Sequence, residues 1–318
     1  HLQIPPKDFI SSFNWAQAIS GPILGVSTNS PLLLGRELWS ETRIALFRQS
    51  LDTRNASFAL KNQHPRVNFG NEWASGTIAD IFKGDIAQHR VILEKDIQSS
   101  SLEDLKNGKI PKLQALCVHN GTIYRWNRPC YGVSKGIAHV RIENRYIPAG
   151  PTSLDEMANF VFWVGLMVGR PPKYDDMASC MDFRDVKSNF IKASRTGRQS
   201  IMQWMGETMS VRKLVIDELL PIAKAGLKKM NIDGVDINRF LNIIEQRAGK
   251  ITGAQWSINS YRQLRKTLKQ DDALLALTKK MHENQSTNLP VHEWPSLKGI
   301  PETHDAAYEV SHIMSTQL

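Results

Sequence analysis

This sequence has few cysteines and no long apolar run, and both features exclude whole classes of protein. The three cysteines, Cys117, Cys130 and Cys180, lack CxxC spacing, so neither a zinc site nor a disulfide framework is predicted. Their small number favours reduced thiols in the cytoplasm. No apolar run reaches the length of a membrane span, and no secretory signal opens the sequence. We therefore expect a cytoplasmic protein without a membrane partner.

Signatures of nucleic-acid binding are also missing, although the formal net charge is +9. A positive charge of this size attracts anions of any kind, including nucleotides and dicarboxylates. The Lys and Arg residues are scattered, apart from short groups such as Lys228-Lys229, and no helix-turn-helix, zinc finger or RNA-binding motif is present. The sequence therefore favours small anionic ligands and gives no support to nucleic acid as a partner.

The hydrophobic and charged fractions, 41% and 22%, are typical of a globular protein. At 318 residues the chain exceeds the usual range of a single core, which predicts one large domain or two smaller ones.

The most informative segment is residues 138–146, Ala-His-Val-Arg-Ile-Glu-Asn-Arg-Tyr. In a strand, successive side chains point to opposite faces. His139, Arg141, Glu143 and Arg145 would then share one face, and the apolar residues would fill most of the other. An ordinary edge strand with a solvated face has the same pattern, but so does a sheet floor that presents charge to an anionic ligand.

The first part of the chain predicts a short strand at residues 1–4 and a helix capped by Asp8. Gly21-Pro22 interrupts or kinks that helix, and residues 27–31 form a polar turn. Residues 76–136 are expected to be short strands and loops. Within them, Ser100 and Glu103 predict a capping box for a short helix ending near Gly108. The Asn-Gly pair at 120–121 predicts a β-hairpin over residues 113–126.

After the charged strand, Ser153 and Glu156 predict a capping box for a helix over Met157–Val168. This helix is almost wholly apolar and is therefore expected to be buried. The segment 188–200 is basic and contains glycine, which suits anion binding by backbone N–H groups and arginine. Residues 207–283 are predicted to be helical, with a kink or restart at Pro221 and a helix ending near Gly249. From residue 284 the chain is expected to be a linker.

The order of these motifs resembles the glutamate–cysteine ligase family, in particular its plant-type and actinobacterial branch. The resemblance extends from residue 1 to about residue 283. Six features carry it: His1-Leu2-Gln3-Ile4, Thr28-Asn29-Ser30-Pro31, the spacing of Arg43 and Arg54, Arg141-Ile142-Glu143-Asn144-Arg145, Phe162-Trp163-Val164-Gly165-Leu166 and Ala223-Lys224-Ala225-Gly226-Leu227.

This resemblance implies an α+β fold of the glutamine-synthetase type, in which helices back an antiparallel sheet. It also implies a reaction in which Mg²⁺ and ATP serve to phosphorylate the γ-carboxylate of glutamate. The amine of cysteine, or another small amine, then attacks the acyl phosphate. Phosphoryl transfer depends mainly on positioning and charge neutralisation, and arginine can hold carboxylate or phosphate in a bidentate pair.

The resemblance also assigns roles to individual residues. Arg145, Arg43 and Arg195 would be catalytic. Substrate would bind to Arg43, Arg54, Asn29, Arg141 and Arg145. The metal would bind Glu143, Gln3 and His1, although histidine is an unusual ligand for magnesium. Two of these positions have simpler explanations, because Arg54 can pair with Asp52 and Asn29 can stabilise its own turn. His139 on the charged strand can be structural.

The sequence departs from the family at its start, because no glutamate-rich strand that would supply most metal ligands is present. We therefore expect a fragment, the C-terminal part of the catalytic domain, that is inactive without its N-terminal segment. Residues 310–318 resemble the opening of a CBS domain, which would follow a linker over 284–309. The alternative to a ligase is a non-catalytic module that senses nucleotide or amino acid.

Overall fold

A three-stranded antiparallel sheet lies at the centre of the computed structural model, which describes residues 1–51, 64–96 and 100–297. The strand order is β1-β7-β6, with β1 at Leu2–Ile4, β6 at Asn127–Ser134 and β7 at Ile137–Asn144. The predicted charged strand is therefore the middle strand of this sheet. Arg54 and residues 298–318, including the segment that resembles a CBS domain, lie outside the described residues.

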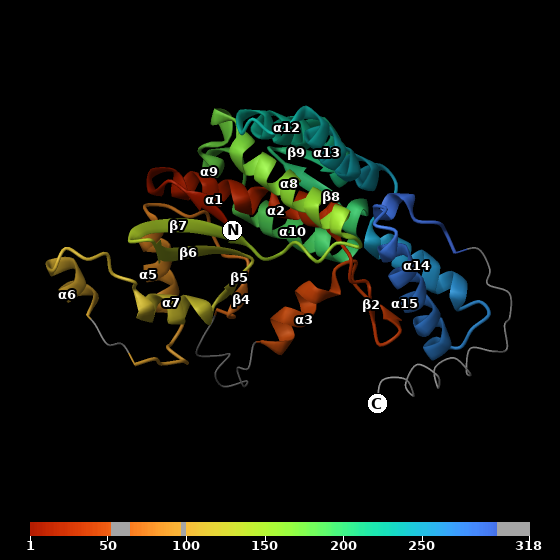
Figure 1. The fold of residues 1–318 in the computed structure, drawn as a ribbon, viewed down its shortest axis with the longest axis horizontal. Helices are drawn as coiled ribbons and strands as arrows, with labels where there is room; N and C mark the ends of the chain where they lie inside the picture. The colour runs from red at the N-terminus through yellow and green to blue at the C-terminus, as the bar shows by residue number, and fades with distance from the viewer. Residues whose placement is uncertain (52–63, 97–99, 298–318) are drawn as a thin grey trace.

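The apolar face of this sheet belongs to the main hydrophobic core. Ile4, Val140 and Ile142 are buried in one cluster with side chains of the surrounding helices. These helices are α1 (Phe9–Ala18), α2 (Ser20–Ser27), α8 (Ser153–Gly169) and α10 (Phe183–Thr196), and in Figure 1 they lie above and to the right of β7. The structure confirms the α+β class and the antiparallel sheet backed by helices.

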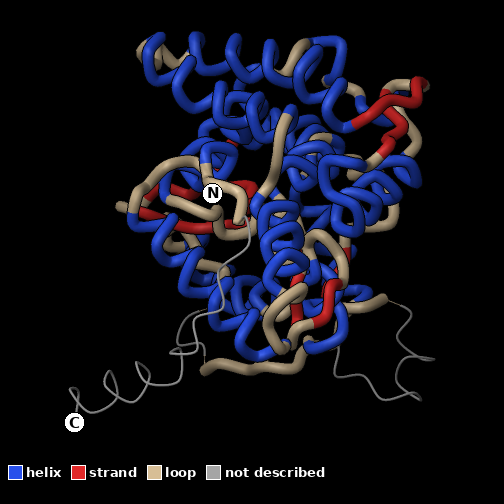
Figure 2. Tube along the Cα trace, turned by 90° about the vertical axis from the view of Figure 1, so that its right-hand side faces the viewer, coloured by secondary structure: helices blue, strands red, loops and turns tan. Residues whose placement is uncertain are grey.

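Helix predominates in the rest of the described chain, and the strands form small separate sheets (Figure 2). The remaining elements are β2 (Leu32–Leu33), β3 (Arg36–Glu37), α3 (Thr42–Ser50), β4 (Val67–Asn68), α5 (Ile78–Gln88), α6 (Ser101–Lys106), α7 (Gln114–Gly121), β5 (Tyr124–Arg125), α9 (Met177–Cys180), β8 (Ile201–Trp204), β9 (Glu207–Ser210), α11 (Val211–Leu214), α12 (Leu220–Lys229), α13 (Gly234–Gly249), α14 (Gly253–Leu264) and α15 (Gln270–Ser286). None of the helices in the described ranges has both the length and the apolar character needed to cross a bilayer.

The predicted hairpin over residues 113–126 is wrong, because most of this segment is the helix α7. The Asn120 side-chain amide donates to the carbonyl oxygen of Pro129 at 2.8 Å, and the His119 ring lies 2.8 Å from the carbonyl oxygen of His89. These contacts hold α7 against β6 and the end of α5. Asn120-Gly121 therefore ends a helix, and tertiary packing overrides its preference for a tight turn.

The interpretation of residues 76–136 as short strands and loops also missed α5. This helix begins with a capping box in which the Asp80 carboxylate accepts from the backbone N–H and the hydroxyl of Thr77, at 2.9 and 2.8 Å. Its buried face contains Ile81 and Phe82. The short helix near residue 100 is confirmed as α6, but Ser100 forms no side-chain cap.

The basic segment 188–200 is mostly the C-terminal half of α10, which corrects the backbone part of its predicted anion-binding role, while the role of its arginines stays a prediction. Asp182 caps α10 by accepting from the backbone N–H of Arg184 at 2.8 Å, and Val186 and Phe190 are buried on its inner face. Backbone N–H groups inside a helix bond to the preceding turn, so they are not available to an anion. The short turn Gly197–Gln199 follows.

The apolar helix after the charged strand is confirmed as α8, but it starts four residues earlier than the predicted Met157, at Ser153. Its cap is Thr152, whose hydroxyl accepts from the backbone N–H of Asp155 at 3.3 Å. The predicted capping box at Ser153 and Glu156 is therefore wrong by one position.

The predicted helices of residues 207–283 are largely confirmed, including the end of α13 at Gly249. Pro221 lies in the first turn of α12, after a π-helical turn at Val215–Leu219, where its missing N–H costs little. Residues 207–210 are an exception, because they form β9 and pair with β8 around a turn at Met205-Gly206.

Part of the predicted linker is packed against the last two helices. Val291 and Trp294 are buried in a second cluster with residues of α14 and α15. The rings of Trp256 and Trp294 lie 4.8 Å apart. Residues 284–297 are thus continuous with the folded part of the chain.

Candidate functional site

The charged face of the sheet is centred on Glu143, as the strand pattern predicted. One carboxylate oxygen of Glu143 lies 3.1 Å from Nε2 of His1. The other lies 2.5 Å from Nε of Arg128 and 3.8 Å from Nε of Arg145. The Glu143 side chain is only 17% exposed, so these contacts are partly shielded from water. We call these four residues the Glu143 cluster.

Arg128 is a member of the Glu143 cluster that the sequence analysis missed. It lies on β6 directly opposite Glu143 on β7, and residues opposite one another in an antiparallel pair share a face. The available signal was the two-residue turn at Lys135-Gly136, where both residues have positive φ. Such a turn fixes the register of the two strands, and that register pairs Arg128 with Glu143.

Arg141 and Gln3 extend the same face along the sheet. Gln3 of β1 pairs with Arg141 of β7, and Gly132 of β6 pairs with His139. A Cβ atom at Gly132 would lie 2.8 Å from Nε2 of His139, so glycine there makes room for the imidazole. The structure thus brings the three predicted metal ligands, His1, Gln3 and Glu143, onto one face with Arg141.

Positive charge exceeds negative charge on this face. Arg128, Arg141 and Arg145 share it with the single carboxylate of Glu143. Among the described residues, Nε of Arg141 and Nη1 of Arg145 are buried without a hydrogen-bond partner. Burial and the neighbouring Arg128 lower the pKa of Arg145, while Glu143 and the ring of Tyr124 oppose that shift. A carboxylate or phosphate would relieve this excess.

Arg43 contacts the chain immediately after β7, where it holds the backbone. Its guanidinium donates to the carbonyl oxygens of Arg145 and Tyr146, and its Nε donates to the carboxylate of Glu41 at 3.2 Å. The side chain of Glu41 is fully buried and also accepts from the hydroxyl of Ser30 at 2.7 Å. Glu41 was not predicted, and it fixes both Arg43 and the polar turn.

Asn29 and Arg195 lie near this second group of contacts. Asn29 donates its side-chain amide to the carbonyl oxygen of Ala149 at 3.0 Å, so this contact joins the polar turn to the segment after β7 and does not lie within the turn itself. The Arg195 guanidinium lies 5.0 Å from the ring centroid of Trp39, and its backbone carbonyl accepts from Ser40. The substrate roles of Asn29, Arg43 and Arg195 stay predictions.

Magnesium does not fit the donor set that the described residues provide. Mg²⁺ takes six oxygen ligands and is usually bound through one or more carboxylates. Here Glu143 supplies the one carboxylate on the face, and its two oxygens already contact other side chains, one at His1 and the other at Arg128. The described part of the chain contains no group of three His, Cys, Asp or Glu residues arranged to hold a metal. The described residues alone therefore need further ligands before they can hold the ion.

Fold and site together define a class of protein, an α+β chain with a cationic sheet face suited to small anions. Residues 1–294 match the model of glutamate-cysteine ligase family 2 (GCS2). Because this match covers most of the 318 residues, the chain belongs to that family. A comparison with curated proteins finds no match. The family resemblance inferred from the six motifs is thereby confirmed, and a general glutamate–cysteine ligase-like function follows from it.

Proposed function

We propose that this chain supplies the anion-binding wall of an ATP-dependent ligase that forms γ-glutamylcysteine through an acyl phosphate. One observation carries the proposal, namely the three guanidinium groups that share a sheet face with a single carboxylate. Glutamate, ATP and an acyl phosphate are all anions. Each reactant that must be held during the first step therefore complements the charge of this face.

Within this proposal, the arginines position and neutralise the anionic groups. Glu143 holds Arg128 and Arg145 through their Nε atoms. The terminal nitrogens of the two guanidinium groups are thereby held in position for an anionic ligand. A guanidinium can donate two parallel hydrogen bonds to a carboxylate or phosphate, and phosphoryl transfer relies on this kind of charge neutralisation. Arg43 acts as a positioning residue, because it holds the backbone of Arg145.

A second candidate function is a module that binds nucleotide or amino acid without catalysis. The specific observation in its favour is that both Glu143 oxygens already have side-chain partners, one at His1 and the other at Arg128. Binding an anion requires only the cations that the face already provides, whereas catalysis by the family's reaction requires more acidic ligands than the described residues hold.

The test is ADP release by the intact gene product with Mg-ATP and glutamate, with and without cysteine. The ligase proposal expects cysteine-dependent release. Arg145→Met should lower kcat/KM for glutamate by at least about tenfold, because it removes a charged donor. Arg184→Met is the matched control, since Arg184 is 89% exposed and pairs only with Asp182.

Two further results separate the candidates. Loss of cysteine-dependent release in Glu143→Gln would support a metal or positioning role for this carboxylate. Nucleotide binding without turnover on any amine would reject the ligase and support the sensor. Residues 1–318 on their own are expected to release no ADP, and turnover by this piece would contradict the prediction that it is an inactive fragment.

A further inference from the structure

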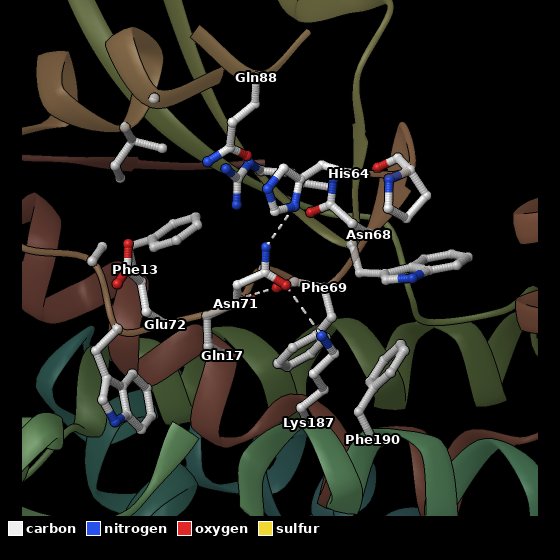
Figure 3. Close-up of a pocket in the computed structure, with 18 of the residues that line it drawn as sticks. Phe13, Gln17, His64, Asn68, Phe69, Asn71, Glu72, Gln88, Lys187 and Phe190 are labelled. Atoms are coloured by element: carbon white, nitrogen blue, oxygen red, sulfur yellow. Dashed lines mark hydrogen bonds between the residues drawn. The ribbon is translucent and has the colours of Figure 1, made fainter. Parts of the chain in front are cut away.

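A cavity of about 570 Å³ lies between α1, α5, α10 and the segment 64–75. Figure 3 shows the side chains that line it. Small-molecule sites in proteins usually have volumes of 300–1,000 Å³, so this cavity is large enough for a ligand. Its lining includes no member of the Glu143 cluster, and none of its residues was predicted to be functional.

The inner wall of the cavity is aromatic. Phe13, Phe69, Trp126 and Phe190 all line it and are buried. The ring of Phe190 lies 4.8 Å from that of Phe69 and 5.9 Å from that of Trp126. Aromatic rings at these separations pack favourably against one another, and a flat apolar group of a ligand can pack against them in the same way.

The buried glutamine beside these rings is already satisfied. Gln17 donates to the carbonyl oxygen of Phe69 at 2.6 Å and accepts from the side-chain amide of Asn127 at 2.7 Å. Both ends of its amide are therefore used within the protein. This part of the wall offers a ligand mainly contact with rings.

At the mouth of the cavity, Asn71 lies between Lys187 and His64 (Figure 3). The ammonium of Lys187 can only donate, so the atom 3.2 Å from it is the amide oxygen of Asn71. The amide nitrogen then faces Nδ1 of His64 at 3.1 Å. Nδ1 must accept this hydrogen bond, which places the proton of the neutral ring on Nε2. His64 and Lys187 are thereby both presented as donors.

The charges around the cavity leave a positive excess. Arg125 is paired with Asp85, at 2.5 Å between the closest atoms, and Asp80 is paired with Lys83 at 3.1 Å. These pairs cancel. Arg48 and Lys187 then remain against Glu72, and within the described ranges no carboxylate lies within ion-pair distance of either cation.

We propose that this cavity binds a small aromatic carboxylate, with its ring against Phe69 and Phe190 and its acid group at the mouth, beside the Lys187 and His64 side chains that Asn71 links. The aromatic wall favours a ligand with a flat apolar ring, and the donors at the mouth favour a negatively charged group on that ligand. This goes beyond the proposed ligase reaction, since neither glutamate nor cysteine has a flat apolar body. Trp126 contacts both regions, since its side chain lines the cavity and its backbone oxygen accepts from the backbone N–H of Arg145 at 2.9 Å.

The first experiment is calorimetric titration of the full chain with naphthalene-2-carboxylate and with 2-naphthylmethylammonium, which has the same ring and the opposite charge. The carboxylate should bind at least about tenfold more tightly than the ammonium. Equal binding of the two probes, or no binding of the carboxylate, would overturn the proposal. Displacement of the carboxylate by ATP would assign the cavity to the nucleotide and would also overturn it.

Two pairs of variants locate the binding. Gly84 lines the cavity, and a Cβ atom there meets no other atom within 4 Å, so Gly84→Leu adds its side chain at a position on the cavity wall that is open to a Cβ atom. It should weaken binding by about tenfold or more, whereas Gly249→Leu, also in open space, should not. Lys187→Glu should weaken binding by about tenfold, and Lys192→Glu, on the same helix outside the cavity, should leave it unchanged. Equal affinities within either pair would contradict the site.

Discussion

Glu143 contacts side chains from three separate places in the chain, at His1, Arg128 and Arg145. A single carboxylate therefore ties β1, β6 and the end of β7 together on the charged face. Nε of Arg141 and Nη1 of Arg145 are left as donors without a partner among the described residues. One residue thus stabilises the sheet and also directs the arginines that the proposed function needs.

Removing Arg128 should weaken the sheet. Arg128→Met keeps most of the side-chain length but leaves the Glu143 carboxylate with longer contacts, the shortest being 3.1 Å to His1. We expect the free energy of unfolding, measured with urea, to fall by about 1–2 kcal/mol. Arg184→Met should cause no measurable change, because its pair with Asp182 is exposed. A similar loss in both variants would argue against a specific role for the Glu143 contacts.

His89 should make stability depend on pH. It is 4% exposed, and burial lowers its pKa from 6.5 to about 4. Between these two values the unfolded chain binds a proton that the folded chain excludes, so stability is present above pH 6.5 and is lost as pH falls towards 4.

Between pH 7.5 and 5 the loss attributable to His89 should be about 2 kcal/mol. His89→Gln should flatten the dependence of the unfolding free energy on pH in this window. His282→Gln, at an exposed position of α15, should leave the slope as it is in the unsubstituted chain. An unchanged slope in His89→Gln would show that the imidazole titrates normally in the folded state.

At the scale of elements, α8 and α12 approach each other through glycine. A Cβ atom at Gly226 would lie 2.0 Å from the carbonyl oxygen of Gly165 and 2.5 Å from the backbone nitrogen of Gly169. Backbone atoms cannot move aside as a flexible side chain can. Gly226→Ala must therefore push the two helices apart, which should cost about 1–3 kcal/mol or more.

Gly84 in α5 provides the opposite case. Its Cβ position is open, so Gly84→Ala should gain up to about 1 kcal/mol from the higher helix propensity of alanine. Thermal unfolding of both variants checks the pair, with Tm expected to fall for Gly226→Ala and to rise for Gly84→Ala. A fall of similar size in both would indicate that helix propensity is not the controlling factor.

The elements that the sequence predicted well are those whose local pattern and tertiary environment agree. The alternation around Glu143 predicted β7, and the apolar stretch after it predicted α8. In both elements most of the residues that the pattern identifies as apolar are buried. The segment around Asn120 was mispredicted because its contacts with Pro129 and His89 are remote in sequence. Arg128 and Glu41 were missed for the same reason, since their importance depends on strand register and on burial.

At the scale of the whole molecule, a buried ion pair links the sheet-backing helix to the C-terminal part of the described chain. Nη1 of Arg247 on α13 lies 3.5 Å from the carboxylate of Asp155 on α8, and both side chains are almost fully buried. Asp155 also accepts from the backbone N–H of Val291 at 3.0 Å. Three segments distant in sequence therefore meet at one carboxylate.

Arg247→Met should be the most damaging of these substitutions. It leaves the charge of Asp155 buried without its cationic partner, and breaking such a pair costs about 3–5 kcal/mol. Adding Asp155→Asn should recover part of the loss, because the double variant no longer buries an unpaired charge. Arg239→Met on the same helix is the control, since Arg239 is exposed and should change the unfolding free energy little.

Hydrogen exchange at Val291 distinguishes a local effect from a global one. If the carboxylate of Asp155 anchors this segment, exchange of the Val291 amide should accelerate in Arg247→Met by more than the loss of global stability accounts for. The reason is that an unpaired buried carboxylate draws in water and competes with its own contact to the backbone. Exchange that follows global unfolding alone would show that residues 284–297 are held by the packing of Val291 and Trp294, and that the ion pair serves only α8 and α13.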